Sequence, residues 1–138
     1  MTTGRAILIV LEVADLARSL AFYRDLIGIP LRADIDHDRA GHGGGDRWIS
    51  GDHAAYSWKD GAFLHFALYQ SKGVVTRGLQ IGFTTDDLDR THRLLTTAGV
   101  RCDCEPRDEP WGRTARYADP DGNSVSLTQT QVQSPPTK

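Results

Sequence analysis

The sequence predicts an α+β fold built from two similar modules, each a strand, a helix and then three further strands. A pattern that begins at Asp15 and includes Arg18 recurs 72 positions later, at Asp87 and Arg90. Each copy follows an apolar run and precedes a helical stripe that ends at a glycine. Because a repeated unit of this size indicates repeated structure, we expect two like modules whose meeting place carries the function.

The first module is predicted to span about residues 5–70. The run from Ala6 to Leu11 is apolar without alternation, which is typical of a central strand covered on both faces. Asp15 then begins an amphipathic helix, which Gly28 ends as a left-handed cap. A polar, glycine-rich loop over 36–46 follows, and three extended segments complete the module: 30–35, 48–58 and 62–69.

The second module is predicted to span about residues 78–129. Its helix is capped by Asp86 or Asp87 and ends at Gly99. Residues 119–123 are predicted to form a tight turn rather than a site. Because a module of about sixty residues would be marginal alone, we expect one domain over 1–129. The extended segments of this module are 79–84, 100–104, 114–118 and 123–128. The tail over 130–138 is predicted to be disordered.

Composition excludes several classes of function. The net charge of −2 and the absence of a basic helix face argue against nucleic acid. No window approaches the run of about 18 apolar residues that a membrane span needs, and the N-terminus lacks a signal-peptide pattern. We therefore expect a cytoplasmic protein with a small-molecule partner and no membrane contact. Cys102 and Cys104 are expected to be reduced structural thiols.

Three stretches resemble the vicinal oxygen chelate superfamily: Val13-Ala14-Asp15-Leu16 through Gly28, Pro110-Trp111-Gly112-Arg113, and Asp119-Pro120-Asp121-Gly122-Asn123. That superfamily groups glyoxalases, ring-cleaving dioxygenases, fosfomycin-resistance enzymes and bleomycin-binding resistance proteins. The resemblance covers about residues 5–129. It implies paired βαβββ modules whose curled mixed sheets enclose a cavity, and a homodimer.

The resemblance also implies where a metal ion would bind. Enzymatic members of the superfamily take ligands from the first and last strand of each module, and the matching positions here are Leu8, Ala67, Gln80 and Ser126. The first two carry no donor atom, and the other two are weak ligands. A shift of two residues in the first module would bring in only His65. The expectation is therefore a protein without a metal ion or another cofactor.

Glu12 stands where glyoxalase-like members carry an arginine that binds a glutathione carboxylate. This reversed charge disfavours glutathione conjugates and favours a cationic or hydrogen-bond-donating ligand. Alternatively, Glu12 is a rim carboxylate paired with an arginine such as Arg113 or Arg116. Strand alternation places His65 on one face with Tyr69, which the resemblance makes the cavity face; the alternative is a hydrogen-bonded core histidine.

The leading hypothesis is a metal-free protein that sequesters an aromatic or cationic compound, as antibiotic-resistance members do. One alternative is a lyase, isomerase or dioxygenase with a metal site rebuilt from His65 and Gln80, or an acid/base catalyst using His65 and Glu12. Another is a regulatory module with a vestigial cavity. We assign no catalytic residue, and the predicted ligand contacts are Glu12, Trp48, Trp58, His65, Tyr69, Gln80 and Trp111.

Overall fold

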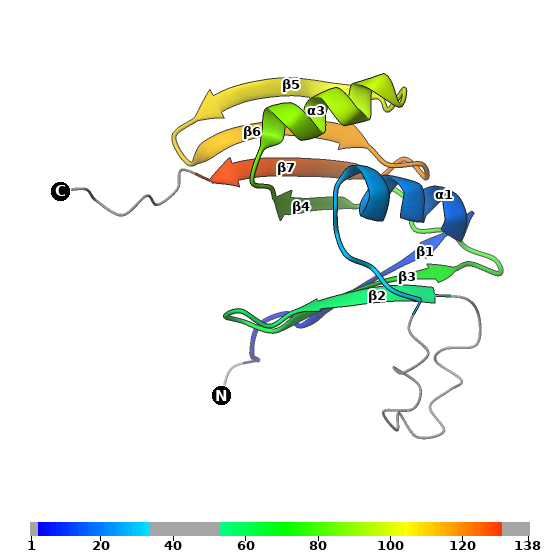
Figure 1. Cartoon of the computed structure of the whole chain (residues 1–138). Helices are drawn as coiled ribbons and strands as arrows, with labels where there is room; N and C mark the ends of the chain where they lie inside the picture. Colours follow the sequence, from blue (N-terminus) through cyan, green and yellow to red (C-terminus); the bar gives the residue numbers. More distant parts are fainter. Residues whose placement is uncertain (1–2, 34–52, 131–138) are drawn as a thin grey trace. The chain divides into compact units, whose positions relative to one another are not determined.

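The computed structural model of the protein describes residues 3–33 and 53–130 (Figure 1). These residues form two compact units. The first unit comprises the chain up to residue 24 together with 28–76, and the second comprises 25–27 together with the chain from residue 77 on. The predicted loop over 36–46 and residues 131–138 of the predicted disordered tail over 130–138 lie outside the described residues, whereas Thr130 is ordered as the last residue of a strand.

The first unit holds a three-stranded mixed sheet with the strand order β1-β3-β2. β1 pairs with β3 in parallel, and β2 pairs with β3 in antiparallel. Of the predicted strand over 30–35, the described part keeps a single bridge between Arg32 and Ala55. The elements are β1 (Leu8–Val13), α1 (Leu16–Leu20), its π-helical continuation η1 (Ala21–Leu26), β2 (His53–Trp58) and β3 (Leu64–Gln70).

The helix of the first unit begins where the sequence predicts. The Asp15 side chain accepts a hydrogen bond from the Arg18 N–H at 3.2 Å, which is an N-cap. Gly28 ends the segment with φ at +97°, in the left-handed region that favours glycine. Tyr23 is fully buried, and its ring lies edge-on to Phe66 of β3 with centroids 5.6 Å apart.

β1 corrects one expectation. The unbroken apolar run predicts a central strand covered on both faces, but in the sheet formed by residues 3–33 and 53–130 β1 is an edge strand. Leu11 and Val13 are fully buried, whereas Leu8 and Val10 on the other face are 57% and 40% exposed. Apolar residues therefore occupy both faces of β1, while the described unit covers only one of them.

The second unit holds a four-stranded mixed sheet with the strand order β4-β7-β6-β5 and one helix, α3. β4 and β7 are parallel, and the other two pairs are antiparallel. α3 contacts β5, β6 and β7 and lies along one face of the sheet (Figure 1). The elements are β4 (Gln80–Thr84), α3 (Leu88–Thr97), β5 (Cys102–Glu109), β6 (Gly112–Ala118) and β7 (Ser124–Thr130).

Alternation along β7 separates the two faces of the second sheet. Val125 and Leu127 are fully buried, whereas Ser124, Ser126 and Thr128 are half-buried. Tyr117 of β6 is also fully buried, and its hydroxyl lies 2.8 Å from Nδ1 of His92 on α3. The apolar face therefore packs against α3, and the serine and threonine face is the opposite one.

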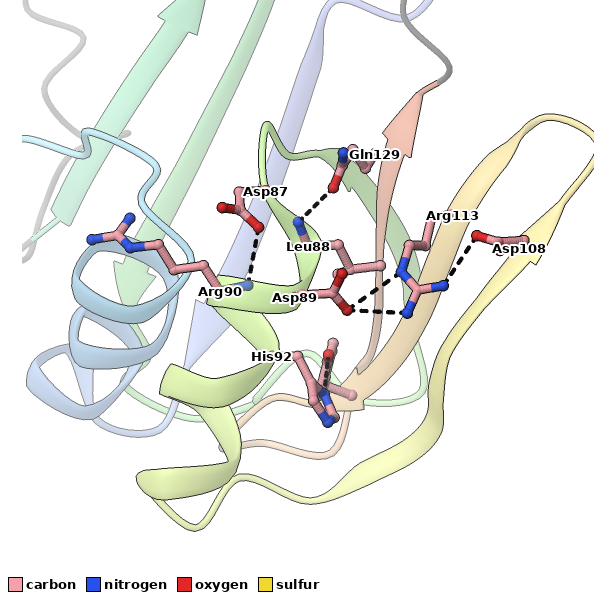
Figure 2. A network of polar contacts seen from close by, with 9 residues as sticks. Asp87, Leu88, Asp89, Arg90, His92, Asp108, Arg113 and Gln129 are labelled. Atoms are coloured by element: carbon pink, nitrogen blue, oxygen red, sulfur yellow. Dashed lines mark hydrogen bonds and ion pairs between the residues drawn. The ribbon is translucent and has the colours of Figure 1, made fainter.

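The start of α3 matches the expected cap, and of the two aspartates considered it is the second that serves. Asp87 accepts a hydrogen bond from the Arg90 N–H at 3.1 Å (Figure 2). Gly99, with φ at +83°, follows the helix end. Among the described residues, no helix is both long enough and apolar enough to pass through a membrane.

Candidate functional site

The serine and threonine face of the second sheet is hollowed at two adjoining places. The larger hollow is a pocket of about 400 Å³ whose lining includes Arg107, Glu109, Trp111, Arg116, Ser126 and Thr128. The smaller hollow has about 240 Å³, and its lining includes Gln80, Gly82, Arg116, Ser124 and Ser126. Arg116 and Ser126 line both. We call this combined surface the β4–β7 hollow.

Strand register explains why these residues meet. Ser126 of β7 lies opposite Arg116 of β6 on one side and opposite Gly82 of β4 on the other. A Cβ atom on Gly82 would lie 2.7 Å from the Ser126 Oγ, so the missing side chain makes room for this hydroxyl. Gln80 is paired with Ser124 two residues further back along the same strands, and therefore on the same face. The floor of the hollow is therefore built from small and polar side chains.

The charged side chains of the β4–β7 hollow differ in whether they already form an ion pair. Arg107 and Glu109 form an ion pair with Nε and Oε2 2.6 Å apart. Arg116 is exposed, and within residues 3–33 and 53–130 its guanidinium forms no ion pair. The aromatic member, Trp111, lies in the two-residue turn between β5 and β6 and is 63% exposed. The larger part of the hollow is thus lined by one cation without an ion-pair partner in the described chain and by one exposed indole.

Arg113 points to the other side of β6, where it forms ion pairs with two aspartates. Its Nη2 lies 3.1 Å from Asp89 of α3, and its Nη1 lies 3.0 Å from Asp108 of β5 (Figure 2). These hydrogen bonds raise the pKa of Arg113 above its ordinary value. The alternative in which Glu12 pairs with Arg113 or Arg116 joins residues of two different units and stays a prediction, although Arg113 already has two carboxylate partners within its own unit.

The first sheet gathers three of the predicted ligand contacts on one face. The register sets Leu8 opposite His65 and Glu12 opposite Tyr69. Because paired residues of neighbouring strands point to the same side, Glu12, His65 and Tyr69 share the face that also carries the exposed Leu8. Glu12 and His65 are nevertheless four positions apart along the strands, roughly 13 Å at 3.3 Å per residue.

Two neighbours of this face went unnoticed in the sequence, and both come from β2. Ser57 lies opposite His65, and its Oγ is 2.6 Å from the His65 Nδ1. His53 lies opposite Tyr69, and the two rings stack with centroids 4.9 Å apart and planes 15° apart. The rings of His65 and Tyr69 are therefore held by partners across the strand, which alternation within β3 alone could not reveal.

The structure does not group Trp58 with these residues. Trp58 is opposite Leu64 and therefore lies on the other face of the first sheet from His65. Its ring packs against Tyr56 and Phe66, with centroids 5.1 and 6.4 Å away. Trp48 lies outside the described residues. Trp111 and Gln80 line the β4–β7 hollow in the second unit.

The residues at the implied metal positions do not fit a divalent ion. Leu8 carries no donor atom and faces His65 across the strand pair. Gln80 and Ser126 offer one amide oxygen and one hydroxyl, which bind such ions weakly. In the part of the chain that the structure describes, no three His, Cys, Asp or Glu side chains are grouped to hold an ion. The lining of the β4–β7 hollow offers a ligand hydrogen bonds, charge and ring contacts.

Several solved structures resemble this chain. TnmS3, an antibiotic binding protein from Streptomyces sp. CB03234, is 28% identical with a TM-score of 0.65, over 95% of this chain and 99% of its own. A glyoxalase/bleomycin resistance protein from the same strain is 28% identical with a TM-score of 0.63, over 91% of this chain and 100% of its own. A glyoxalase/dioxygenase from Nostoc punctiforme shares the fold at 21% identity and a TM-score of 0.69, over 93% of this chain and 92% of its own.

The search of curated proteins finds no match. The sequence model of one family, in contrast, matches residues 6–127. This stretch contains both repeated helix starts and every strand of the two sheets except the last three residues of β7. The chain belongs to the Glyoxalase/Bleomycin resistance protein/Dioxygenase superfamily.

Proposed function

We propose that this protein binds an aromatic small molecule without the help of a metal ion and sequesters it. The observation that carries this proposal is the β4–β7 hollow, whose main pocket of about 400 Å³ has the size of an ordinary ligand site. Trp111 supplies an exposed ring for stacking, and polar side chains on the floor supply hydrogen bonds. Such a surface supports binding without any catalytic group.

The similarity to TnmS3 supports the same function. That protein is an antibiotic binding protein, and the 28% identity extends over 95% of this chain. We infer that this chain binds a compound of comparable kind and lowers its free concentration, which is how a binding protein confers resistance. A homodimer and a cytoplasmic location belong to this proposal.

The weak donor set at the implied metal positions supports binding that does not depend on a metal. The predicted preference for a cationic ligand rests on Glu12, whose carboxylate is exposed on β1 and forms no ion pair with a described residue of its own unit. This side chain remains available to a positively charged group of a ligand.

An enzyme is the second candidate because of one observation, the short contact between Ser57 and His65. A histidine whose ring nitrogen is hydrogen-bonded to a hydroxyl group is suited to moving a proton. The separation of Glu12 from His65 along the strands disfavours these two as an acid/base pair on one substrate atom. His65 and Gln80, the pair considered for a rebuilt metal site, lie in different units.

Native mass spectrometry of the protein from cell extract tests the proposal. We expect a co-purified organic compound, recovered with its mass unchanged, and no stoichiometric metal ion. The spectrum also reports whether the protein is a homodimer. Stoichiometric metal that is lost in His65→Ala or Gln80→Ala would overturn the proposal in favour of the enzyme.

A panel of planar aromatic natural products tests whether the protein binds such compounds and whether Trp111 contacts them. We expect at least one to raise the melting temperature of the full chain. Trp111→Ala should weaken that compound's binding about tenfold, whereas Trp111→Phe, which keeps a ring for stacking, should retain most of it. Equal affinities for wild type and Trp111→Ala would contradict the assignment of the hollow as the binding site.

A further inference from the structure

We propose that the β4–β7 hollow recognises a carboxylate on the aromatic ligand, and that Arg116 is the residue that binds it. This inference rests on the proposed function, which supplies the aromatic ligand, and adds the chemical group that the site selects. Arg116 lies on β6, between Ser126 of β7 and Cys104 of β5. It lines both parts of the hollow, so a ligand in either part meets its guanidinium.

The charge of the lining favours an anion. The smaller part of the hollow contains Arg116 and no carboxylate. The larger part adds Arg107 and Glu109, which are already paired with each other at 2.6 Å. Two arginines and one glutamate leave one net positive charge on the lining. A cationic group would be repelled by Arg116 and would find no free carboxylate in the lining. In this hollow a carboxylate therefore replaces the cationic ligand expected from Glu12, which lies in the first unit and not in the lining.

The side chains around Arg116 are free to donate hydrogen bonds to the same group. In the described part of the chain, the side chains of Gln80, Ser124 and Ser126 make no hydrogen bond. Thr114 and Thr128, by contrast, are bonded to each other at 3.1 Å. A guanidinium donates two parallel hydrogen bonds to a carboxylate, and hydroxyl and amide donors complete its shell. The hollow thus combines an unpaired cation with neutral donors.

The test compares two probes of the same shape, naphthalene-2-carboxylate and its neutral amide, by calorimetry on the full chain at neutral pH. We expect wild type to bind the carboxylate about tenfold more tightly than the amide, because hydrogen bonds between charged partners are the stronger ones. Added salt should reduce this preference. Arg116→Gln should abolish this preference, because the affinity for the carboxylate should fall about tenfold more than the affinity for the amide.

Arg93→Gln is the matched control. Arg93 is an exposed arginine on α3, on the other side of the sheet, so this substitution removes the same charge without touching the hollow. We expect it to keep the full preference for the carboxylate. Because Arg116 is exposed and unpaired among the described residues, Arg116→Gln should fold, and an unchanged melting temperature checks this.

Each other outcome counts against the inference. Equal affinity of wild type for both probes contradicts it but leaves the proposed function standing. A preference that survives in Arg116→Gln, or that is lost equally in Arg93→Gln, contradicts the assignment to Arg116. Displacement of the naphthoate by equimolar inorganic phosphate shows a general anion site and overturns the aromatic carboxylate. If neither probe binds at millimolar concentration, the inference is also overturned. The proposed function is then tested separately, by whether native mass spectrometry finds a co-purified organic compound.

Discussion

Gln70 and Gln129 hold the first turn of a helix in the same way in the two units. The side-chain oxygen of Gln70 accepts a hydrogen bond from the Leu16 N–H at 2.8 Å. The side-chain oxygen of Gln129 accepts one from the Leu88 N–H, also at 2.8 Å (Figure 2). Each glutamine comes from the last strand of its own unit, and each acts beside an aspartate cap. The repeat therefore extends to contacts between distant parts of the chain.

The two glutamines should respond differently to replacement by glutamate. Gln129→Glu keeps the acceptor at the start of α3 and adds a charge that helix N-termini favour, so the free energy of unfolding should be unchanged or slightly higher. Gln70 also donates from Nε2 to the Ala14 carbonyl at 2.9 Å. Gln70→Glu loses this donor and sets a carboxylate against a carbonyl, which should cost roughly 1 to 3 kcal/mol.

Urea denaturation of both variants measures this contrast. The alanine variants are the controls, because each removes the acceptor and should cost about 1 kcal/mol through the uncapped N–H. If Gln70→Glu is as stable as Gln129→Glu, the second set of hydrogen bonds made by Gln70 does not contribute to stability.

The two helices show how far the sequence determines the fold. The sequence predicts Asp15 as one cap and Asp86 or Asp87 as the other, because an N-cap acts on an N–H only three residues away. Gln70 and Gln129 were not identified, because their partners lie 54 and 41 positions away and no local pattern marks such a pair. Local chemistry is readable in the sequence, whereas contacts between strand and helix require the register of the sheet.

Asn123 should be essential to the turn between β6 and β7. It is 1% exposed, donates from Nδ2 to Asp119 at 3.0 Å, and accepts from the Leu79 N–H at 2.9 Å. Asn123→Ala removes the acceptor of the half-buried Leu79 N–H and one donor to the buried Asp119, which should cost roughly 2 to 4 kcal/mol, measured as the free energy of unfolding.

Asn123→Asp separates the two contacts of this side chain. It keeps an acceptor for Leu79 but places a second carboxylate beside Asp119, so it should also destabilise the protein at neutral pH. Its deficit relative to wild type should shrink on acidification as one carboxyl takes up a proton. An aspartate variant as stable as wild type at pH 7 would show that the Asp119 contact is dispensable.

Tyr117 should make the protein less stable in alkali. Burial raises the pKa of its phenol above the ordinary value of 10.0. Above pH 10 the unfolded chain therefore releases this proton while the folded chain retains it, so the unfolding free energy falls by about 1.4 kcal/mol per pH unit for this group. Below pH 10 both states hold the proton, and the contribution is constant.

Tyr117→Phe isolates this effect. The variant should lose about 1 kcal/mol at pH 7, because the His92 Nδ1 loses its 2.8 Å partner, but its stability should fall less steeply than that of wild type above pH 10. Unfolding free energies at pH 7 and at a series of values above pH 10 supply both comparisons. Parallel pH profiles for the two proteins would assign the alkaline loss to other groups.

The candidate site was harder to predict than the fold, for a geometric reason. Alternation within β3 correctly predicts that His65 and Tyr69 share one face, because side chains an even number of residues apart along a strand point to the same side of the sheet. Trp58 was chosen for its size, and only the pairing with Leu64 shows that it lies on the opposite face. Arg116 was considered solely as a partner for Glu12. Its place in the hollow follows from three paired strands, which one stretch of sequence cannot reveal.

Gly82 should matter for ligand binding and not for stability. Its backbone is not in the left-handed region, so alanine is tolerated, and the unfolding free energy of Gly82→Ala should stay within about 0.5 kcal/mol of wild type. The added Cβ would lie 2.7 Å from the Ser126 Oγ and must push this hydroxyl aside. We expect the affinity for naphthalene-2-carboxylate to fall several-fold, through a narrower floor and a displaced donor.

A double-mutant cycle distinguishes this contact from a general effect of added volume. Ser126→Ala removes the atom that the new Cβ would strike, so adding Gly82→Ala in that background should cost little further affinity. If the clash is the cause, the two losses measured by calorimetry are therefore less than additive. Full additivity would mean that Gly82 and Ser126 act independently, and that the absence of a side chain at Gly82 does not position the hydroxyl for the ligand.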